Sequence, residues 1–369
     1  MISTRRAIGG LLLLAAAARA AAVSDAPLGV GTPGPVRGLF LELPLSDARG
    51  AGAPTVEARW WLANDWSVPT RLRRGDQTVL LEEDAQGDAL QLTVTVPWDR
   101  LLRAAWAGRV ESRAELRATV WWGGWTDRPI ERWHEAIGSW NFERQLHAPD
   151  VVGLRMGEEG GKELADVRGS RFALGDLALR TQVRLASGQA RGGAPTWAIA
   201  LRADLKLPTG RLRSLGGSGG VDCGLGLAGT WAPARWFTGH LLGDVRLVSG
   251  LPRGFPLQPR TVQWGADLSL VFRIAGRVAL VVEDRLSSPL FEGSWKLAEA
   301  VKEPEATAYY VLFRPHNQLS GGVRVGEVTV FFSEDFTPGR RLATDPGPGW
   351  FYNSNGPDFV LGLSWARRL

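Results

Sequence analysis

Apolar and polar residues alternate along most of the chain, and this alternation is the strongest structural signal in the sequence. Between positions 177 and 185, three leucines and a valine occupy alternate positions, and Arg180 and Arg184 lie between them. An extended strand with this pattern has one apolar face and one polar face. The same pattern recurs in the segments 197–207, 262–273, 328–333 and 358–368. The sequence therefore predicts an all-β protein.

About twelve segments carry this pattern, and most are close to the ~10 residues that a tilted membrane-spanning strand needs. They lie near 55–64, 82–97, 113–122, 176–186, 196–206, 221–231, 235–247, 261–273, 277–287, 309–323, 325–336 and 357–367. Short connections, such as 232–234, alternate with long ones, such as 123–175 and 337–356. Bacterial outer-membrane barrels combine short periplasmic turns with long external loops. We expect an antiparallel up-and-down transmembrane β-barrel of about twelve strands over 55–369, with one short helix in the long external loop 123–175.

Tryptophans support a membrane setting, because aromatic rings gather at bilayer interfaces. Seven of them lie near strand ends on the predicted outer face: Trp60, Trp98, Trp122, Trp197, Trp231, Trp264 and Trp365. The alternative is a soluble sandwich or lipocalin-like barrel, whose core the tryptophans would fill. Charges on the polar face of nearly every strand favour the water-filled or salt-bridged lumen of a membrane barrel.

The first 22 residues have the features of a secretory signal. Arg5 and Arg6 precede the apolar stretch 8–18, and Ala20 and Ala22 suit the small-residue positions before a cleavage site. The sequence therefore predicts export to the outer membrane of a Gram-negative bacterium, with the signal removed. Residues 23–54 then form an N-terminal lead-in to the barrel.

Charge and cysteine content exclude several classes of protein. The full chain has a net charge of +5, and three of its arginines lie in the signal, so the mature chain is close to +2 without a block of like charge. A nucleic-acid partner is not expected, and the expected partners are outer-membrane lipid and small polar solutes. The single cysteine, Cys223, excludes a disulfide framework and a cysteine-rich metal site, and we expect no metal and no cofactor.

A short helix is predicted within the loop 123–175. Asp127 is a suitable N-cap, and Pro129 falls in the first turn. Ile130, Trp133 and Ile137 share one helical face by their spacing. We expect this apolar face to pack into the barrel mouth as a plug, as in other barrels with a plugged lumen.

Three residues are weak candidates for catalysis. Glu131 and His134 are three positions apart on the predicted helix, so they can present a carboxylate and an imidazole to one metal or proton. The structural alternative is an exposed face with a cap or ion pair. His316 lies near the tenth strand, where a lipid hydrolase embedded in a barrel wall would need a serine and a polar third partner. It follows Pro315, which also suits a simple strand bend.

The polar faces of the predicted strands collect charges of both signs. The candidate lumen residues are Arg180, Arg184, Arg202, Asp204, Lys206, Asp267, Glu283 and Arg285. One interpretation is a salt-bridged filling that stiffens the barrel. The other is a polar pathway in which Arg180, Arg184 and Arg202 attract anions. Twelve strands lie between filled eight-stranded barrels and open sixteen-stranded porins, so the number leaves both interpretations open.

Several short segments resemble one known family. They are Gly34-Pro35 through Leu39-Phe40 to Pro44-Leu45, Gly123 to Asp127 with Ile130, Glu131 and His134 through Gly138, Leu174 to Asp176, and Leu205 to Gly210 followed by Gly217 to Gly219 and Asp222. Together they resemble the bacterial outer-membrane-barrel family of unknown function called domain of unknown function 3187. The resemblance spans most of the mature chain and implies an outer-membrane barrel. The activity of that family is uncharacterised, so the resemblance implies no catalytic residue.

Three functions follow from these features. The leading one is passive passage or binding of small polar or anionic solutes through a charge-lined lumen that is open or plugged. A barrel-embedded lipid-modifying hydrolase that uses a histidine is the alternative from the enzyme class. The third is a structural or scaffold barrel without transport.

Overall fold

A computed structural model describes residues 24–32, 34–50, 52–66, 69–98, 108–137, 148–189, 195–297, 312–335 and 359–369. The predicted signal 1–22 lies outside these residues, as does the whole of the loop 337–356. None of the described helices has the length and hydrophobicity needed to cross a bilayer.

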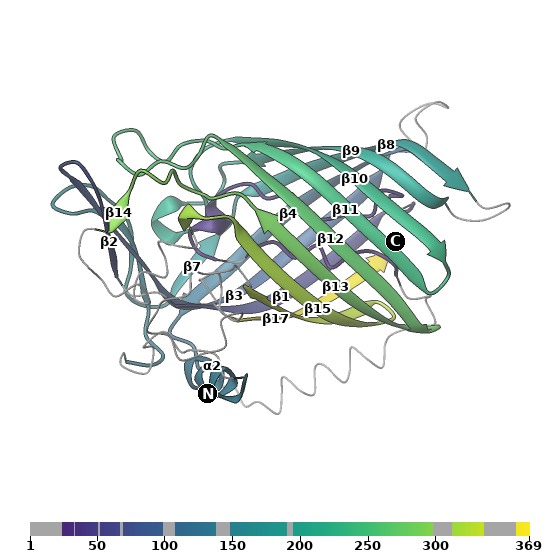
Figure 1. Cartoon of the computed structure of the whole chain (residues 1–369), viewed down its shortest axis with the longest axis horizontal. Helices are drawn as coiled ribbons and strands as arrows, with labels where there is room; N and C mark the ends of the chain where they lie inside the picture. The colour runs from purple at the N-terminus through teal and green to yellow at the C-terminus, as the bar shows by residue number, and fades with distance from the viewer. Residues whose placement is uncertain are drawn as a thin grey trace, which may run out of the picture.

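Twelve long antiparallel strands form a closed barrel (Figure 1). They are β1 (Thr55–Trp66), β3 (Gln77–Pro97), β4 (Val110–Trp122), β8 (Leu177–Gln189), β9 (Pro195–Leu207), β10 (Asp222–Ala234), β11 (Phe237–Leu247), β12 (Val262–Ala275), β13 (Val278–Ser287), β15 (His316–Val325), β16 (Val328–Asp335) and β17 (Phe359–Arg368). Each pairs with the next in this order, and β17 pairs with β1, where Thr55 lies opposite Arg368. The predicted twelve-stranded up-and-down barrel is confirmed.

The connections divide the barrel into two ends, which we call the loop end and the turn end. Connections at the loop end include 208–221 and 248–261, and those at the turn end include 235–236 and 276–277. The first barrel strand starts at the turn end, and the last one finishes there, because Leu369 donates its N–H to the carbonyl oxygen of Pro54 at 2.9 Å.

Five short strands that the alternation did not predict extend the sheet at the loop end. They are β2 (Thr70–Arg74), β5 (Gly153–Glu158), β6 (Glu163–Val167), β7 (Arg171–Leu174) and β14 (Lys296–Leu297). The first residues of β3, 77–83, continue past the barrel wall and pair with β2 and β5. Leu72, Leu81 and Leu154 are fully buried in the apolar cluster beneath this extension.

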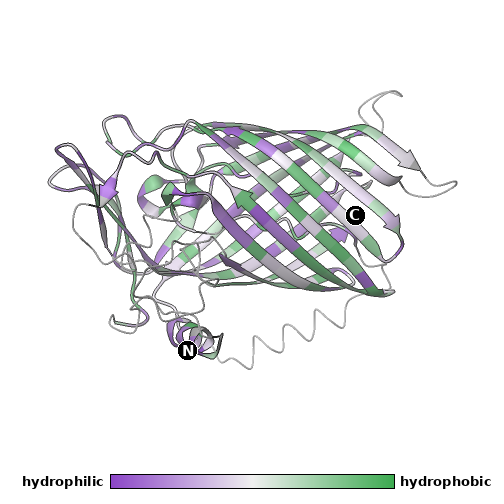
Figure 2. Ribbon diagram, in the orientation of Figure 1, coloured by the Kyte–Doolittle hydropathy of each residue, from purple (hydrophilic) through white to green (hydrophobic). Residues whose placement is uncertain are grey.

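The barrel wall is apolar outside and polar inside, because successive side chains of a strand point to opposite faces. On β10, Leu225 and Leu227 are exposed on the outer face, whereas Asp222 is buried inside. On β12, Val262 and Trp264 are exposed outside and Asp267 is buried inside. Figure 2 shows the resulting alternation of apolar and polar positions along each strand.

The lead-in lies inside the barrel. Asp25 contacts Arg273 at the turn end, and the short 3-10 helix η1 (Arg37–Leu39) lies at the loop end, where Arg37 donates to Ser287. The chain then returns to the turn end, where the N–H of Ala48 donates to Thr230. We call residues 24–50 the lead-in hairpin, with an ascending limb (24–36), an apex (37–39) and a descending limb (40–50). In Figure 1 it is the purple segment within the barrel.

The helix α2 (Asp127–Ile137) lies outside the barrel wall, so the prediction that its apolar face packs into the barrel mouth is wrong. The ring of Trp133 lies 6.5 Å from that of Phe332 on β16. Phe331 and Ser333, the neighbours of Phe332, are buried on the inner face, so Phe332 points outward. The lumen is already occupied by the lead-in hairpin, and Trp133 packs on the outer face instead.

Gly362 on β17 is a position where packing in the lumen requires glycine. It lies opposite Phe331, whose ring would come within 2.0 Å of a Cβ atom added at Gly362. The guanidinium of Arg59 lies over the same ring, 5.8 Å from its centre.

We predict that Gly362→Val lowers the free energy of unfolding by about 1–3 kcal/mol, because the Phe331 ring must leave its position beside the β1–β17 seam. The measurement is urea-induced unfolding of the protein in lipid vesicles. Gly243→Val is the matched control, because a Cβ atom added at Gly243 meets nothing within 4 Å. Equal unfolding midpoints for the two variants would contradict the prediction.

Candidate functional site

The lead-in hairpin and the polar inner wall together form the candidate site. The hairpin has no strand and no α-helix, so its buried backbone N–H and C=O groups need partners from elsewhere. In the ascending limb, Arg59 of β1 donates to the carbonyl oxygens of Leu28 and Gly29, both at 2.7 Å. Arg324 of β15 does the same nearer the turn end. Basic side chains of the wall therefore replace the missing strand partner.

The apex and the descending limb are held in the same way by four predicted lumen residues. The contacts to carbonyl oxygens are Lys206 to Leu39 at 2.8 Å, Arg180 to Glu42 at 2.7 Å, Arg202 to Pro44, and Arg184 to Arg49 at 3.0 Å. The row of arginines predicted to attract anions thus binds the backbone of the chain itself.

Acidic wall residues accept hydrogen bonds from backbone N–H groups of the hairpin. Glu283 of β13 accepts from Gly29 at 3.0 Å and from Val30 at 3.1 Å. Asp222 of β10 accepts from Leu41 at 2.9 Å. The wall therefore needs charges of both signs to bind the hairpin, because the hairpin backbone has N–H donors and C=O acceptors.

The wall charges also pair with one another. Arg180 contacts Glu115 at 3.1 Å and Asp204 at 2.5 Å, and Arg202 reaches the same Asp204 oxygen at 2.8 Å. Buried charges are tolerated when they are paired and hydrogen-bonded, so this group needs all its members. Loss of one partner would leave a buried charge behind.

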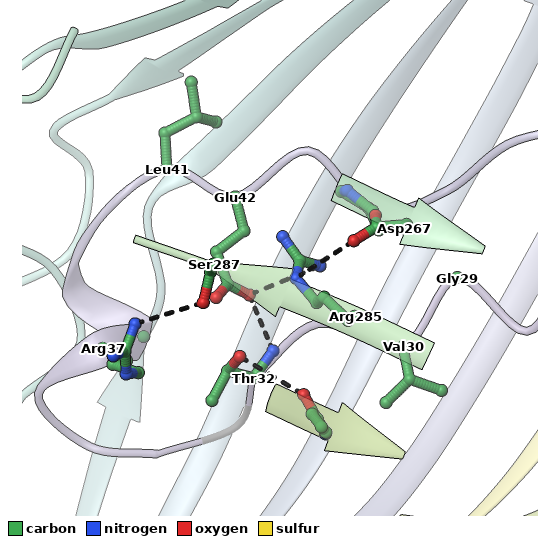
Figure 3. A network of polar contacts seen from close by, with 12 residues as sticks. Gly29, Val30, Thr32, Arg37, Leu41, Glu42, Asp267, Arg285 and Ser287 are labelled. Atoms are coloured by element: carbon green, nitrogen blue, oxygen red, sulfur yellow. Dashed lines mark hydrogen bonds and ion pairs between the residues drawn. The ribbon is translucent and has the colours of Figure 1, made fainter. Parts of the chain in front are cut away.

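A second charged group joins both limbs to the opposite wall (Figure 3). Arg285 of β13 lies 3.7 Å from Asp267 of β12 and 4.0 Å from Glu42 of the descending limb. The Glu42 carboxylate also accepts the N–H of Thr32 in the ascending limb at 2.7 Å. Glu42 therefore connects the two limbs and the wall.

The structure places the predicted lumen residues on the inner face. Seven are buried, and Arg184 is half-buried: the seven are Arg180, Arg202, Asp204, Lys206, Asp267, Glu283 and Arg285. The charged residues Asp25 and Glu42 were not predicted as lumen residues, because they belong to the lead-in and not to a strand.

One cavity of about 80 Å³ remains between the hairpin and the wall formed by β1, β3, β4 and β8. Its charged lining consists of Arg59, Arg117, Arg180, Lys206, Glu42, Glu115 and Asp176. Two smaller hollows, of about 10 and 20 Å³, lie nearer the turn end along β4 and β8. Arginines line both of them.

The catalytic candidates are not brought together by the structure. His316 is buried inside the barrel, and its Nε2 atom lies 3.2 Å from Asp335. This position is away from the lipid-facing surface that a wall-embedded hydrolase would use. Glu131 lies on the exterior helix α2, and the side chain of His134 lies outside the described part of the chain. Within the described ranges, no cluster of ligands suits a metal ion.

The predicted loop motif holds the start of α2 against the end of β1. Asp127 accepts hydrogen bonds from Asn64 at 3.0 Å and from the N–H of Asp150 at 2.7 Å. Ile130 is buried. The contacts of Asp127 and Ile130 fix the loop, which is a structural role.

The one sequence signal for a filled lumen was glycine on the inner face. A Cβ atom added at Gly224 would lie 2.6 Å from the side chain of Leu43, and one added at Gly322 would lie 2.9 Å from Leu28. Inner positions without a side chain therefore mark where the apolar residues of the hairpin press against the wall.

Two charged groups at the loop end have perturbed acidity. Burial lowers the pKa of Arg37 to about 10, although Glu42 and Asp335 favour its charged form. Burial raises the pKa of Glu83 to about 7, against the hydrogen bond from the Val36 N–H and the charge of Arg37. Glu83 lies in the part of β3 that extends past the wall, beside the apex of the hairpin.

We predict that Glu83 makes stability depend on pH. Its pKa is higher in the folded than in the unfolded protein, so the folded state binds the proton more tightly between pH 4.5 and about 7. The free energy of unfolding should fall across this window as pH rises, by on the order of 2 kcal/mol, and level off above it. Unfolding in urea at several pH values measures this. Glu83→Gln should reduce the fall by about this amount, and the exposed control Glu159→Gln should keep it; the same fall in both variants would refute the assignment.

The chain can now be compared with known proteins. Among solved structures, the COG4313 outer membrane channel from Pseudomonas putida F1 is 12% identical with a TM-score of 0.49, and the match covers 89% of this chain and 100% of that one. The NanC porin is 8% identical with a TM-score of 0.40, covering 84% and 98%. No curated protein matches the sequence. The sequence model of the family described as "Protein of unknown function (DUF3187)" matches residues 80–314, more than half of the chain. The chain therefore belongs to the DUF3187 family, as its motifs suggested.

Proposed function

We propose that this protein is an outer-membrane channel for small polar solutes, anions in particular, and that the lead-in hairpin closes it at rest. The observation that carries the proposal is a polar lumen filled by a segment that pairs with no strand. The hairpin is held by side chains, and the twelve-stranded ladder does not depend on it.

The outer face supports the membrane location. Leu225, Leu241 and Val245 are each more than half exposed, and similar residues follow on the neighbouring strands. An apolar surface of this extent suits hydrocarbon and would be a liability in water. With short turns toward the periplasm and long loops outside, the hairpin enters and leaves the lumen on the periplasmic side.

The contacts of the hairpin suit a movable closure. Many of them are hydrogen bonds between a charged side chain and a backbone group, and water or a solute can replace such a partner at modest cost. The apex is the tighter point, because Val36, Leu39 and Phe40 join the apolar cluster beneath the loops. The rival interpretation is a permanent filling, in which these contacts never open.

The cavity and the two smaller hollows support an anionic preference. They follow one another along β4 and β8 from the loop end to the turn end, and their arginines are Arg59, Arg117 and Arg180 in the first, Arg113, Arg180 and Arg202 in the second, and Arg49, Arg109 and Arg184 in the third. Basic side chains outnumber carboxylates in each lining, and a path with an excess of one sign of charge concentrates solutes of the opposite sign.

We predict that a cross-link between the hairpin and the wall suppresses conduction. Leu43→Cys and Gly224→Cys place two thiols at a contact of the descending limb, in a background where the exposed Cys223 is replaced by Ser. Single-channel current in a planar bilayer should be absent in the oxidised protein and return after reduction, because only then can the hairpin move.

One further preparation completes this test. A variant lacking residues 26–50, shown to be folded by its heat-modifiable migration on gels, should conduct more than the intact protein. Equal current in the oxidised and reduced forms would show that the hairpin does not close the path. The absence of single-channel current in all preparations would favour a scaffold barrel.

We also predict that the arginine row sets ion selectivity. Replacing Arg180 and Arg184 with Ala should lower the anion-to-cation permeability ratio by at least about twofold, because two positive charges leave the path. The reversal potential in a KCl gradient measures this ratio. Arg235→Ala, at an exposed turn, is the control. An unchanged ratio would remove Arg180 and Arg184 from the path.

A further inference from the structure

The cavity of about 80 Å³ in the lumen contains a guanidinium group without a carboxylate within ion-pair distance, and we propose that it binds a small organic monocarboxylate through Arg117. The inference deepens the proposed channel function by naming a class of solute. Binding itself does not require the hairpin to move, so the two can be tested separately.

The other three basic residues of the cavity are already neutralised. Arg59 pairs with Glu57 at 2.7 Å. Arg180 pairs with Glu115 and Asp204. Lys206 lies 2.8 Å from Asp176 and 3.1 Å from Asp222. Each of these cations therefore already has a carboxylate within ion-pair distance.

Arg117 differs from them. It projects from β4 into the cavity, and its Nη2 atom donates to the carbonyl oxygen of Gly38 at 2.9 Å. Within the described part of the chain, no carboxylate lies within ion-pair distance of it. A carbonyl oxygen accepts a hydrogen bond but carries no net charge, and a guanidinium has five N–H groups. Most of the donors of Arg117 therefore remain for a ligand.

The backbone around Arg117 holds the guanidinium in place. The carbonyl oxygen of Arg117 accepts the N–H of Gly175 at 2.7 Å, where the wall passes from β7 to β8. At the other end, a Cβ atom added at Gly38 would lie 2.7 Å from the Arg117 Nη2 atom. Glycine at position 38 is thus what lets the hairpin apex approach the guanidinium, and the donor is oriented before a ligand arrives.

The lining favours one negative charge on an organic group. Glu42, Glu115 and Asp176 face the same cavity, so a second charge on the ligand would meet three carboxylates. Part of the lining is apolar: Val30, Phe40, Trp61, Ala178 and Val360. These side chains suit a short hydrocarbon tail, and a carboxylate matches the fork of a guanidinium with two parallel hydrogen bonds. The volume of about 80 Å³ limits the tail to a few carbons.

The test is calorimetric titration of the intact protein in detergent with butyrate. We expect one butyrate per chain, no binding of the neutral isostere butyramide, and an affinity for butyrate at least about tenfold lower in Arg117→Gln, because a bidentate charged contact is lost. Arg109→Gln is the matched control, since Arg109 lies outside this cavity at the turn end. Its affinity should equal that of the unchanged protein. Heat-modifiable migration on gels verifies that each variant is folded.

Three results would overturn the inference: equal butyrate affinity in Arg117→Gln and Arg109→Gln, equal affinity for butyrate and butyramide, or no butyrate binding by the folded, unchanged protein. Butyrate binding at Arg117 in a protein that never conducts would refute the channel and leave the site standing. Conduction without butyrate binding would refute the site and leave the channel standing.

Discussion

The structure depends on one constraint: a backbone inside a barrel must find hydrogen-bond partners for both its N–H and its C=O groups. The strands satisfy one another, but the lead-in hairpin has no strand beside it. Side chains of the wall take over this task, with Arg59 and Arg180 for carbonyl oxygens and Glu283 and Asp222 for N–H groups. The lumen has charges of both signs because of this requirement. From the sequence alone, these charges fit both a salt-bridged filling and a polar pathway.

The barrel could be predicted from the sequence because the alternation of a half-buried strand is a local property. The hairpin could not, since its partners are far away in the chain: Val30 and Glu283 are separated by 253 positions. The short strands β2, β5 and β14 were missed for a related reason. β5 is buried on both faces, so its residues do not alternate regularly, and β2 and β14, with five and two residues, are too short to show a pattern.

The sequence could predict which residues of the candidate site point into the lumen, but it could not predict what those residues contact. Inward arginines such as Arg184 and Arg202 follow from strand register, yet a sequence cannot tell whether a guanidinium faces water, a carboxylate or a carbonyl oxygen. Arg117 is a second example. The other basic residues of the cavity each have a carboxylate within ion-pair distance, whereas Arg117 contacts a carbonyl oxygen. The pairing of His316 with Asp335 likewise joins two strands whose register only the fold fixes.

Both ends of the hairpin lie at the turn end of the barrel, and this has a topological consequence. A segment that entered at one end and left at the other would be threaded, and it could leave only by being drawn lengthwise through the whole lumen or by opening the seam between β1 and β17. A segment that enters and leaves at the same end is not threaded. It can withdraw completely or be inserted after the seam has formed, without breaking a single pair of the ladder. The order of barrel closure and lumen filling during assembly is therefore unconstrained by the path of the chain.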